Sequence, residues 1–200
     1  MKNIITISRE FGSGGHFIGE TLAKELGFTF YGREIIAQAA EKTGLSEKYI
    51  EKRGEYAPKE NIFSYALMGR DTQGSSVDDY IYNTQRTIIL DLAQKGNCII
   101  IGRCADYILK DRNDVLNVFI YGNQQKKCQR IMDLYRKNET EALKLMKNTD
   151  KKRSINYTYH TEQKWGDTKN YAICLNSSIL GYKHCISIIK ESMDAPDDIF

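Results

Sequence analysis

The sequence predicts an α/β fold with a parallel sheet, because short runs of β-branched and apolar residues alternate with longer segments of helical periodicity. The runs are apolar throughout, which is typical of strands that helices cover on both faces. Strands that are joined through helices make right-handed crossovers and lie parallel. The length of 200 residues, with 41% hydrophobic and 28% charged residues, fits a single domain over residues 1–200.

Five strands are expected, at residues 3–8, 28–31, 98–101, 115–121 and 171–175. A glycine loop follows the first strand and leads into a helix that ends at Gly27. A second helix is predicted over about 33–43, with Gly44 as its stop, and a long amphipathic helix over 76–95. Two further helices follow the fourth and fifth strands, and Ser178 is the expected N-cap after the fifth.

Three regions are expected within the single domain. Residues from about 32 to 96 form a substrate-side helical region, in which 45–74 show only a weak pattern of short polar pieces. Residues from about 136 to 170 form a lid and the loop that follows it. Residues 194–200 are a loose acidic tail.

Charge and cysteine content exclude several classes of protein. The 29 basic and 26 acidic residues nearly balance, so +3 is too small a net charge for a sequence-independent nucleic-acid binder. Ten basic and four acidic residues in 126–153 nevertheless concentrate +6 there and leave −3 elsewhere. Apolar runs are far shorter than the ~20 residues of a membrane span. Without a signal peptide we expect a cytoplasmic protein, whose five cysteines without CxxC spacing are buried free thiols.

The loop Gly12-Ser13-Gly14-Gly15 is the most informative motif. Glycines allow several backbone N–H groups to point at one anion, and the N-terminus of the following helix, which begins near His16, adds partial positive charge. That chemistry suits a phosphate, although a tight turn that needs glycine for its geometry alone has a similar sequence. The position favours a ligand, because open parallel sheets bind ligands beyond the carboxyl ends of their strands.

This loop lacks the side chains of the Walker A pattern GxxxxGK[ST]. Gly15 stands where the lysine belongs, and His16 and Phe17 stand where small or hydroxyl residues would lie. The cation must therefore come from elsewhere, with Arg9 and His16 as the nearest candidates. Arg9 could equally be a surface residue that pairs with Glu10.

Arginine and lysine side chains after the third strand and in the basic segment could supply that charge. Arg103 follows the third strand and would face the same crevice, unless it makes a surface pair with Asp106. Asp106 itself could bind substrate or metal-bound water, or be a favourable first-turn carboxylate. Lys152 and Arg153 lie in a polar helix that resembles a lid, although a solvated helical face would look the same. Arg130, on the preceding helix, could join them or face solvent.

Five segments in the same order, residues 7–15, 31–36, 100–106, 149–153 and 165–177, resemble the bacterial cytidylate kinase-like family of P-loop proteins. The resemblance implies a three-layer P-loop kinase fold with a helical lid, and transfer of the γ-phosphoryl of ATP with Mg²⁺. It implies that Gly12 to His16 hold the donor phosphates and that Arg33 and Arg103 hold the acceptor phosphate. Lys152 and Arg153 would be the lid cations. Cys104 stands where cytidylate kinases have an acidic residue.

We therefore expect an ATP-dependent phosphotransferase that acts on a nucleoside monophosphate or another small acceptor, with Arg9, Arg103, Lys152 and Arg153 as catalytic cations. The alternative is a protein with a degenerate loop that binds a nucleotide or phosphometabolite without turnover. Nucleic-acid binding through the basic helix ranks last, because no recognition motif accompanies it. The helix at 76–95 could also pack against a second copy of the chain.

Overall fold

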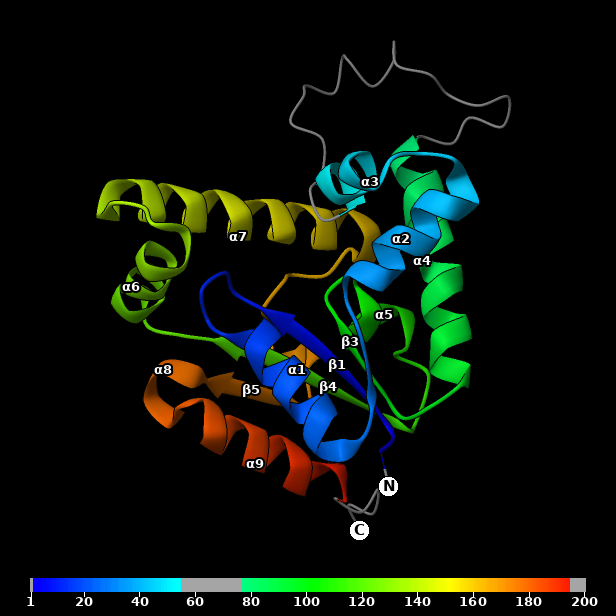
Figure 1. The fold of residues 1–200 in the computed structure, drawn as a ribbon. Coiled ribbons are helices and arrows are strands. Elements are labelled where there is room, and N and C mark those ends of the chain that lie inside the picture. The colour runs from blue at the N-terminus through cyan, green and yellow to red at the C-terminus, as the bar shows by residue number, and fades with distance from the viewer. Residues whose placement is uncertain (1, 55–76, 195–200) are drawn as a thin grey trace.

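In the computed structural model, residues 2–54 and 77–194 are described, so most of the expected polar pieces at 45–74 and the tail from 195 lie outside the described residues. Those two ranges contain one sheet of five parallel strands in the order β2-β3-β1-β4-β5 (Figure 1). The strands are β1 (Ile4–Arg9), β2 (Thr29–Tyr31), β3 (Cys98–Ile101), β4 (Val115–Tyr121) and β5 (Ile173–Asn176). The predicted fold class is confirmed.

Alternating side chains of the central strand β1 fill two separate cores. Ile5 and Ile7 pack with α1 (Gly15–Leu26) and α9 (Tyr182–Met193) on one face of the sheet. Ile4 packs on the other face. That face is covered by α2 (Arg33–Thr43), α3 (Glu47–Gly54), α4 (Val77–Gln94) and α5 (Ala105–Ile108). All three isoleucines are fully buried, because side chains alternate along a strand between two covered faces.

Two helices lie beyond the carboxyl edge of the sheet (Figure 1). They are α6 (Gln124–Tyr135) and α7 (Glu139–Thr161), and α7 begins with a capping box between Asn138 and Glu141. Ala142 and Met146 of α7 pack against α6, while Tyr157 is buried near the other end of α7. The predicted lid helix is thus part of one continuous helix, and side chains near both of its ends pack against the rest of the protein.

The predicted cap at Ser178 is wrong. β5 runs one residue further than expected, and Asn176 caps the short α8 (Ser177–Leu180) by accepting a hydrogen bond from the backbone N–H of Ser178. The hydroxyl of Ser178 accepts instead from the backbone N–H of Asn123 at 2.9 Å. The turn before α9 is made by Gly181.

The loop between β1 and α1 depends on a glycine that no other residue can replace without strain. Gly14 has φ +81°, a left-handed conformation in which a Cβ costs energy. A Cβ there would also lie 2.5 Å from Cε1 of Tyr182 at the start of α9. The loop is therefore held against the next helix by both backbone conformation and close packing.

Replacing Gly14 with Ala is expected to destabilise the fold more than replacing Gly27 with Ala. Gly27 has φ +68° but no atom within 4 Å of an added Cβ, so it carries the backbone cost of about 1–2 kcal/mol alone. Gly14→Ala must also displace Tyr182, which should add at least about 1 kcal/mol. Urea unfolding of both variants measures the difference, and equal losses would show that Tyr182 does not constrain the loop.

Candidate functional site

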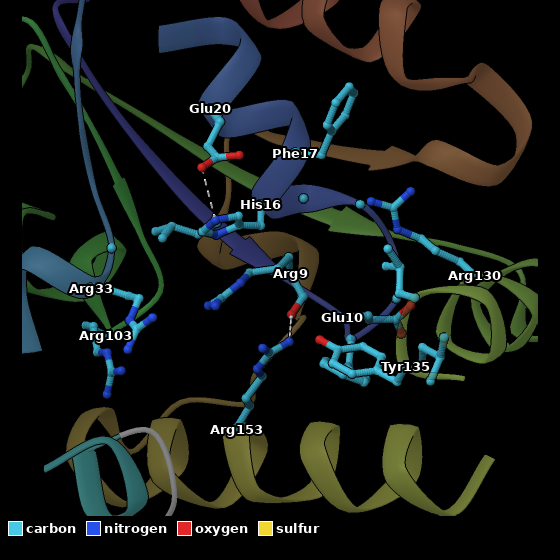
Figure 2. A pocket seen from close by; sticks show the side chains of 18 of the residues that line it. Arg9, Glu10, His16, Phe17, Glu20, Arg33, Arg103, Arg130, Tyr135 and Arg153 are labelled. Atoms are coloured by element: carbon cyan, nitrogen blue, oxygen red, sulfur yellow. Dashed lines mark hydrogen bonds and ion pairs between the residues drawn. The ribbon is translucent and has the colours of Figure 1, made fainter. Parts of the chain in front are cut away.

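A cleft of about 560 Å³ opens at the carboxyl edge of the sheet, beside the loop that joins β1 to α1 (Figure 2). Its lining comes from this loop and from α1, α2, α3, α6 and α7, together with the end of β3 and the residues that follow it. Five arginines line it: Arg9, Arg33, Arg103, Arg130 and Arg153. Such a concentration of guanidinium groups favours an anionic ligand.

The start of α1 is open to a ligand at this cleft. Gly14 is its N-cap, and no side chain in the described parts of the chain caps the first turn. Gly15 and His16 line the cleft beside these backbone N–H groups, which are suited to phosphate oxygens. Ser13 does not line the cleft: its buried hydroxyl donates to the carbonyl of Glu10 at 2.8 Å and fixes the loop from within.

A buried lysine, which the sequence reasoning missed as a site residue, holds the loop from beneath. Lys127 of α6 donates to Oε2 of Glu10 at 2.7 Å, and the backbone N–H of Gly122 donates to the same oxygen at 3.1 Å. The Lys127 side chain is only 8% exposed. Glu10 is thus paired with Lys127. Arg9 lines the cleft, so it is not simply the surface partner of Glu10 that the sequence allowed.

Asp150 joins the loop to α7. Its Oδ1 accepts a hydrogen bond of 2.7 Å from the backbone N–H of Phe11, and its carboxylate lies 3.9 Å from both Lys127 Nζ and Arg153 Nη1. Burial raises the pKa of Asp150 to about 6, against the opposing effects of the Phe11 hydrogen bond and the two cations. The ionised carboxylate is held where it can orient both the loop and a cation of α7.

Arg153 reaches from α7 to the end of β1. Its Nη1 donates to the backbone carbonyl of Arg9 at 3.0 Å, and its guanidinium lies 5.7 Å from the ring centre of Phe11 (Figure 2). Of the two expected lid cations, Arg153 lines the cleft whereas Lys152 is not among its lining residues. The helical phase of α7 explains the difference, because successive residues point in directions about 100° apart.

Three arginines gather at the end of the cleft that is furthest from α6. In Figure 2, Arg9 points toward the side on which Arg33 and Arg103 lie. Arg103 has φ +59° between Gly102 and Cys104, which are also left-handed. Two successive residues with side chains in this conformation are strained, and such strain is concentrated at functional sites. The backbone after β3 is therefore bent so that Arg103 lines the cleft.

Asp106 lies behind the cleft rather than in it. The carboxylate is buried, accepts a hydrogen bond of 2.7 Å from the hydroxyl of Tyr157, and lies 3.4 Å from the hydroxyl of Ser8. Burial raises its pKa to about 6, and both hydrogen bonds oppose this effect. The expected ligand role of Asp106 gains no support from its position, because it supports the strand ends that carry the cleft.

The sequence left open whether Arg130 joins the other cations or faces solvent. It lines the cleft, and its Nη1 donates to the hydroxyl of Tyr182 at 2.9 Å. The expected His16 also lines the cleft, with Nε2 at 3.5 Å from Oε1 of Glu20. Tyr182 was predicted only as a member of an apolar helix stripe, and nothing in the sequence indicates that it covers Gly14.

Residues 2–54 and 77–194 contain neither a candidate metal cluster nor a membrane-spanning helix. No group of three His, Cys, Asp or Glu side chains in these ranges could hold a metal ion. No helix there is both long and apolar enough to cross a bilayer. The five cysteines are free, and all are buried except Cys174, which is partly exposed.

Comparison with known proteins places the chain. The family model described as the cytidylate kinase-like family matches residues 4–179. A solved uncharacterised protein from Eubacterium ventriosum is 27% identical, with a TM-score of 0.72 over 98% of this chain and 100% of that one. No curated protein matches.

Two more distant structures share the fold alone. Shikimate kinase from Bacteroides thetaiotaomicron is 14% identical, with a TM-score of 0.54 over 96% of this chain and 98% of its own. A sugar kinase from Janibacter is 14% identical, with a TM-score of 0.52 over 97% and 95%. The five-stranded parallel sheet, the open start of α1 and the family match agree, and the chain belongs to the cytidylate kinase-like family with the P-loop kinase fold.

Proposed function

We propose that this protein is an ATP-dependent phosphotransferase that transfers the γ-phosphoryl group to a nucleoside monophosphate or another small acceptor in the cytoplasm. The observation that carries the proposal is the shared cleft: the open start of α1 and five arginine side chains line one space. Phosphoryl transfer needs positioning and positive charge more than covalent chemistry, and this cleft offers both.

The two ends of the cleft suit the two substrates. Residues 12–16 would hold the donor phosphates, because the start of α1 lines the cleft and has no side-chain cap on its first turn. Arg33 and Arg103, at the opposite end, would hold the acceptor phosphate in bidentate contacts. Arg153 lies between the two ends of the cleft (Figure 2). We assign the catalytic cation of α7 to Arg153 rather than to Lys152, because Arg153 lines the cleft.

In the proposed reaction, an acceptor oxygen forms a bond to the γ-phosphorus while the bond from that phosphorus to the β,γ-bridging oxygen breaks. ADP leaves with the bonding electron pair, and the guanidinium groups balance the charge on the transferred oxygens. Mg²⁺ would arrive with ATP, since the described residues offer no three-ligand cluster and this ion takes most of its ligands from phosphates and water.

A second candidate function is nucleotide binding without turnover, and the loop sequence favours it. Gly15 and His16 replace the lysine and the hydroxyl residue of the Walker A pattern. A panel of nucleoside monophosphates, nucleosides and small hydroxylated metabolites, assayed with ATP and Mg²⁺, separates the two functions. Tight ATP binding without any phosphorylated product would support the sensor.

Arg153→Ala is expected to lower kcat by about a hundredfold, as removal of one donor to a transition-state oxygen typically does. Lys147→Ala is the matched control, because Lys147 is an exposed cation of the same helix. Steady-state kinetics of both variants at constant ionic strength measure the effect. Equal activity of the two variants would show that Arg153 has no part in transfer.

Arg33→Ala is expected to raise KM for the acceptor about tenfold or more while leaving KM for ATP unchanged, because a charged hydrogen bond is worth about 1.5–3 kcal/mol. Arg130→Ala should have the opposite effect, since Arg130 lies on α6 on the loop side of the cleft (Figure 2). Initial rates with each substrate varied in turn distinguish the two. A rise in both constants for both variants would contradict the assignment of the two ends.

Asp150→Asn is expected to be more stable than the unchanged protein at pH 7.5. Burial raises the pKa of Asp150 from 3.8 to about 6 in the folded state, so the folded chain binds a proton more readily between these values. Ionisation above pH 6 therefore lowers the stability of the unchanged protein, and the advantage of the variant should shrink toward pH 4.5. Urea unfolding at both pH values tests the sign, and a less stable variant at pH 7.5 would contradict it.

A further inference from the structure

Positions 9 and 15 face each other across the start of the loop. A Cβ atom added to Gly15 would lie 2.6 Å from Cβ of Arg9 and 3.0 Å from its Cγ. Gly15 is the first residue of α1 and does not have a positive φ, so its backbone accepts any residue. The contact with Arg9 is what excludes a side chain at position 15.

The same two positions are exchanged relative to the Walker A pattern. When Gly14 is placed on the second glycine of GxxxxGK[ST], the lysine falls at position 15 and the first glycine falls at position 9. This chain has the reverse, with Arg9 in place of that glycine and Gly15 in place of that lysine. In both arrangements one of the two facing positions carries a cation and the other leaves room for it.

The backbone of Arg9 is fixed on several sides. It is the last residue of β1 and pairs with Ile120 of β4, and its carbonyl accepts the hydrogen bond from Arg153. The side chain lines the cleft and points from the loop toward Arg103, with Nη1 of its guanidinium against Gly102 (Figure 2). The backbone from which this cation extends is thus held in place before any ligand binds, which favours electrostatic preorganisation.

We propose that Arg9 is the catalytic cation that replaces the loop lysine, and that position 15 is glycine to admit it. This inference rests on the proposed function, because Arg9 would contact the phosphates held at the start of α1. The class of ligand that its guanidinium recognises is a chain of linked phosphates, such as the triphosphate of ATP or inorganic tripolyphosphate.

The facing arrangement is tested by stability measurements that need no substrate. Gly15→Ala should lower the unfolding midpoint when it is made in the wild-type protein. It should do the same in the Arg9→Ala variant, which retains the Cβ at position 9. In the Arg9→Gly background the same substitution should cost little, because the opposing Cβ is gone. An equal loss in unfolding midpoint in all three backgrounds would show that position 9 does not exclude a side chain at position 15, and would contradict the proposal.

The role of the charge is tested with inorganic tripolyphosphate by calorimetry, in parallel with phosphotransfer assays. Arg9→Met keeps most of the side-chain stem, and should weaken tripolyphosphate binding about ten- to a hundredfold while the variant remains folded. Arg9→Lys should retain part of the affinity. The double variant Arg9→Gly with Gly15→Lys should recover it, because the cation then stands where the Walker A pattern has it.

The outcomes separate this inference from the proposed function. If Arg9→Met binds tripolyphosphate and transfers phosphoryl groups as well as the unchanged protein, the inference is wrong and the proposed function stands. If Arg9→Met loses tripolyphosphate binding and no acceptor is ever phosphorylated, the proposed transfer fails while Arg9 remains the phosphate-binding cation. If the double variant folds but does not bind tripolyphosphate, a cation at position 15 cannot replace Arg9, and the proposed equivalence of the two positions is wrong.

Discussion

A partly buried ion pair between Lys127 and Glu10 is the interaction on which the site depends. A charged pair that is partly removed from water needs further hydrogen bonds to offset its desolvation, and the backbone N–H of Gly122 donates one to the Glu10 carboxylate. The pair joins α6 to the residue that follows β1, and the loop that opens on the cleft begins at that residue.

From this pair the charges extend in one connected series toward the cleft. Asp150 lies between Lys127 and Arg153, and Arg153 in turn contacts the backbone of Arg9. Lys127 is nearly buried at one end of this series, and Arg153 and Arg9 line the cleft at the other end. Five arginines and three glutamates line the cleft, so a nearly neutral chain carries an excess of positive charge there.

Most of the fold could be predicted because its signals are local. Strands that are apolar on both faces and helices that end at glycine can be read in windows of a few residues, and the strand ends lie within two residues of the expected positions. The cleft-lining positions of Arg9 and Arg103 could be expected because both lie at or just after strand ends. Lys127 was missed as a site residue because its partner Glu10 is 117 residues away and neither neighbourhood shows that they meet. The mutual exclusion of side chains at positions 9 and 15 depends on the direction of two Cα–Cβ bonds. The spacing of residues along the sequence does not reveal that direction.

The close approach of positions 9 and 15 also restricts how such a loop can change over evolutionary time. A lineage that has arginine at position 9 cannot first acquire lysine at position 15, because both side chains would need the same space. It must first lose the arginine and pass through an ancestor in which neither position carries the cation. If Arg9 is the phosphate-binding cation, that ancestor binds phosphates more weakly, which disfavours passage between the two arrangements.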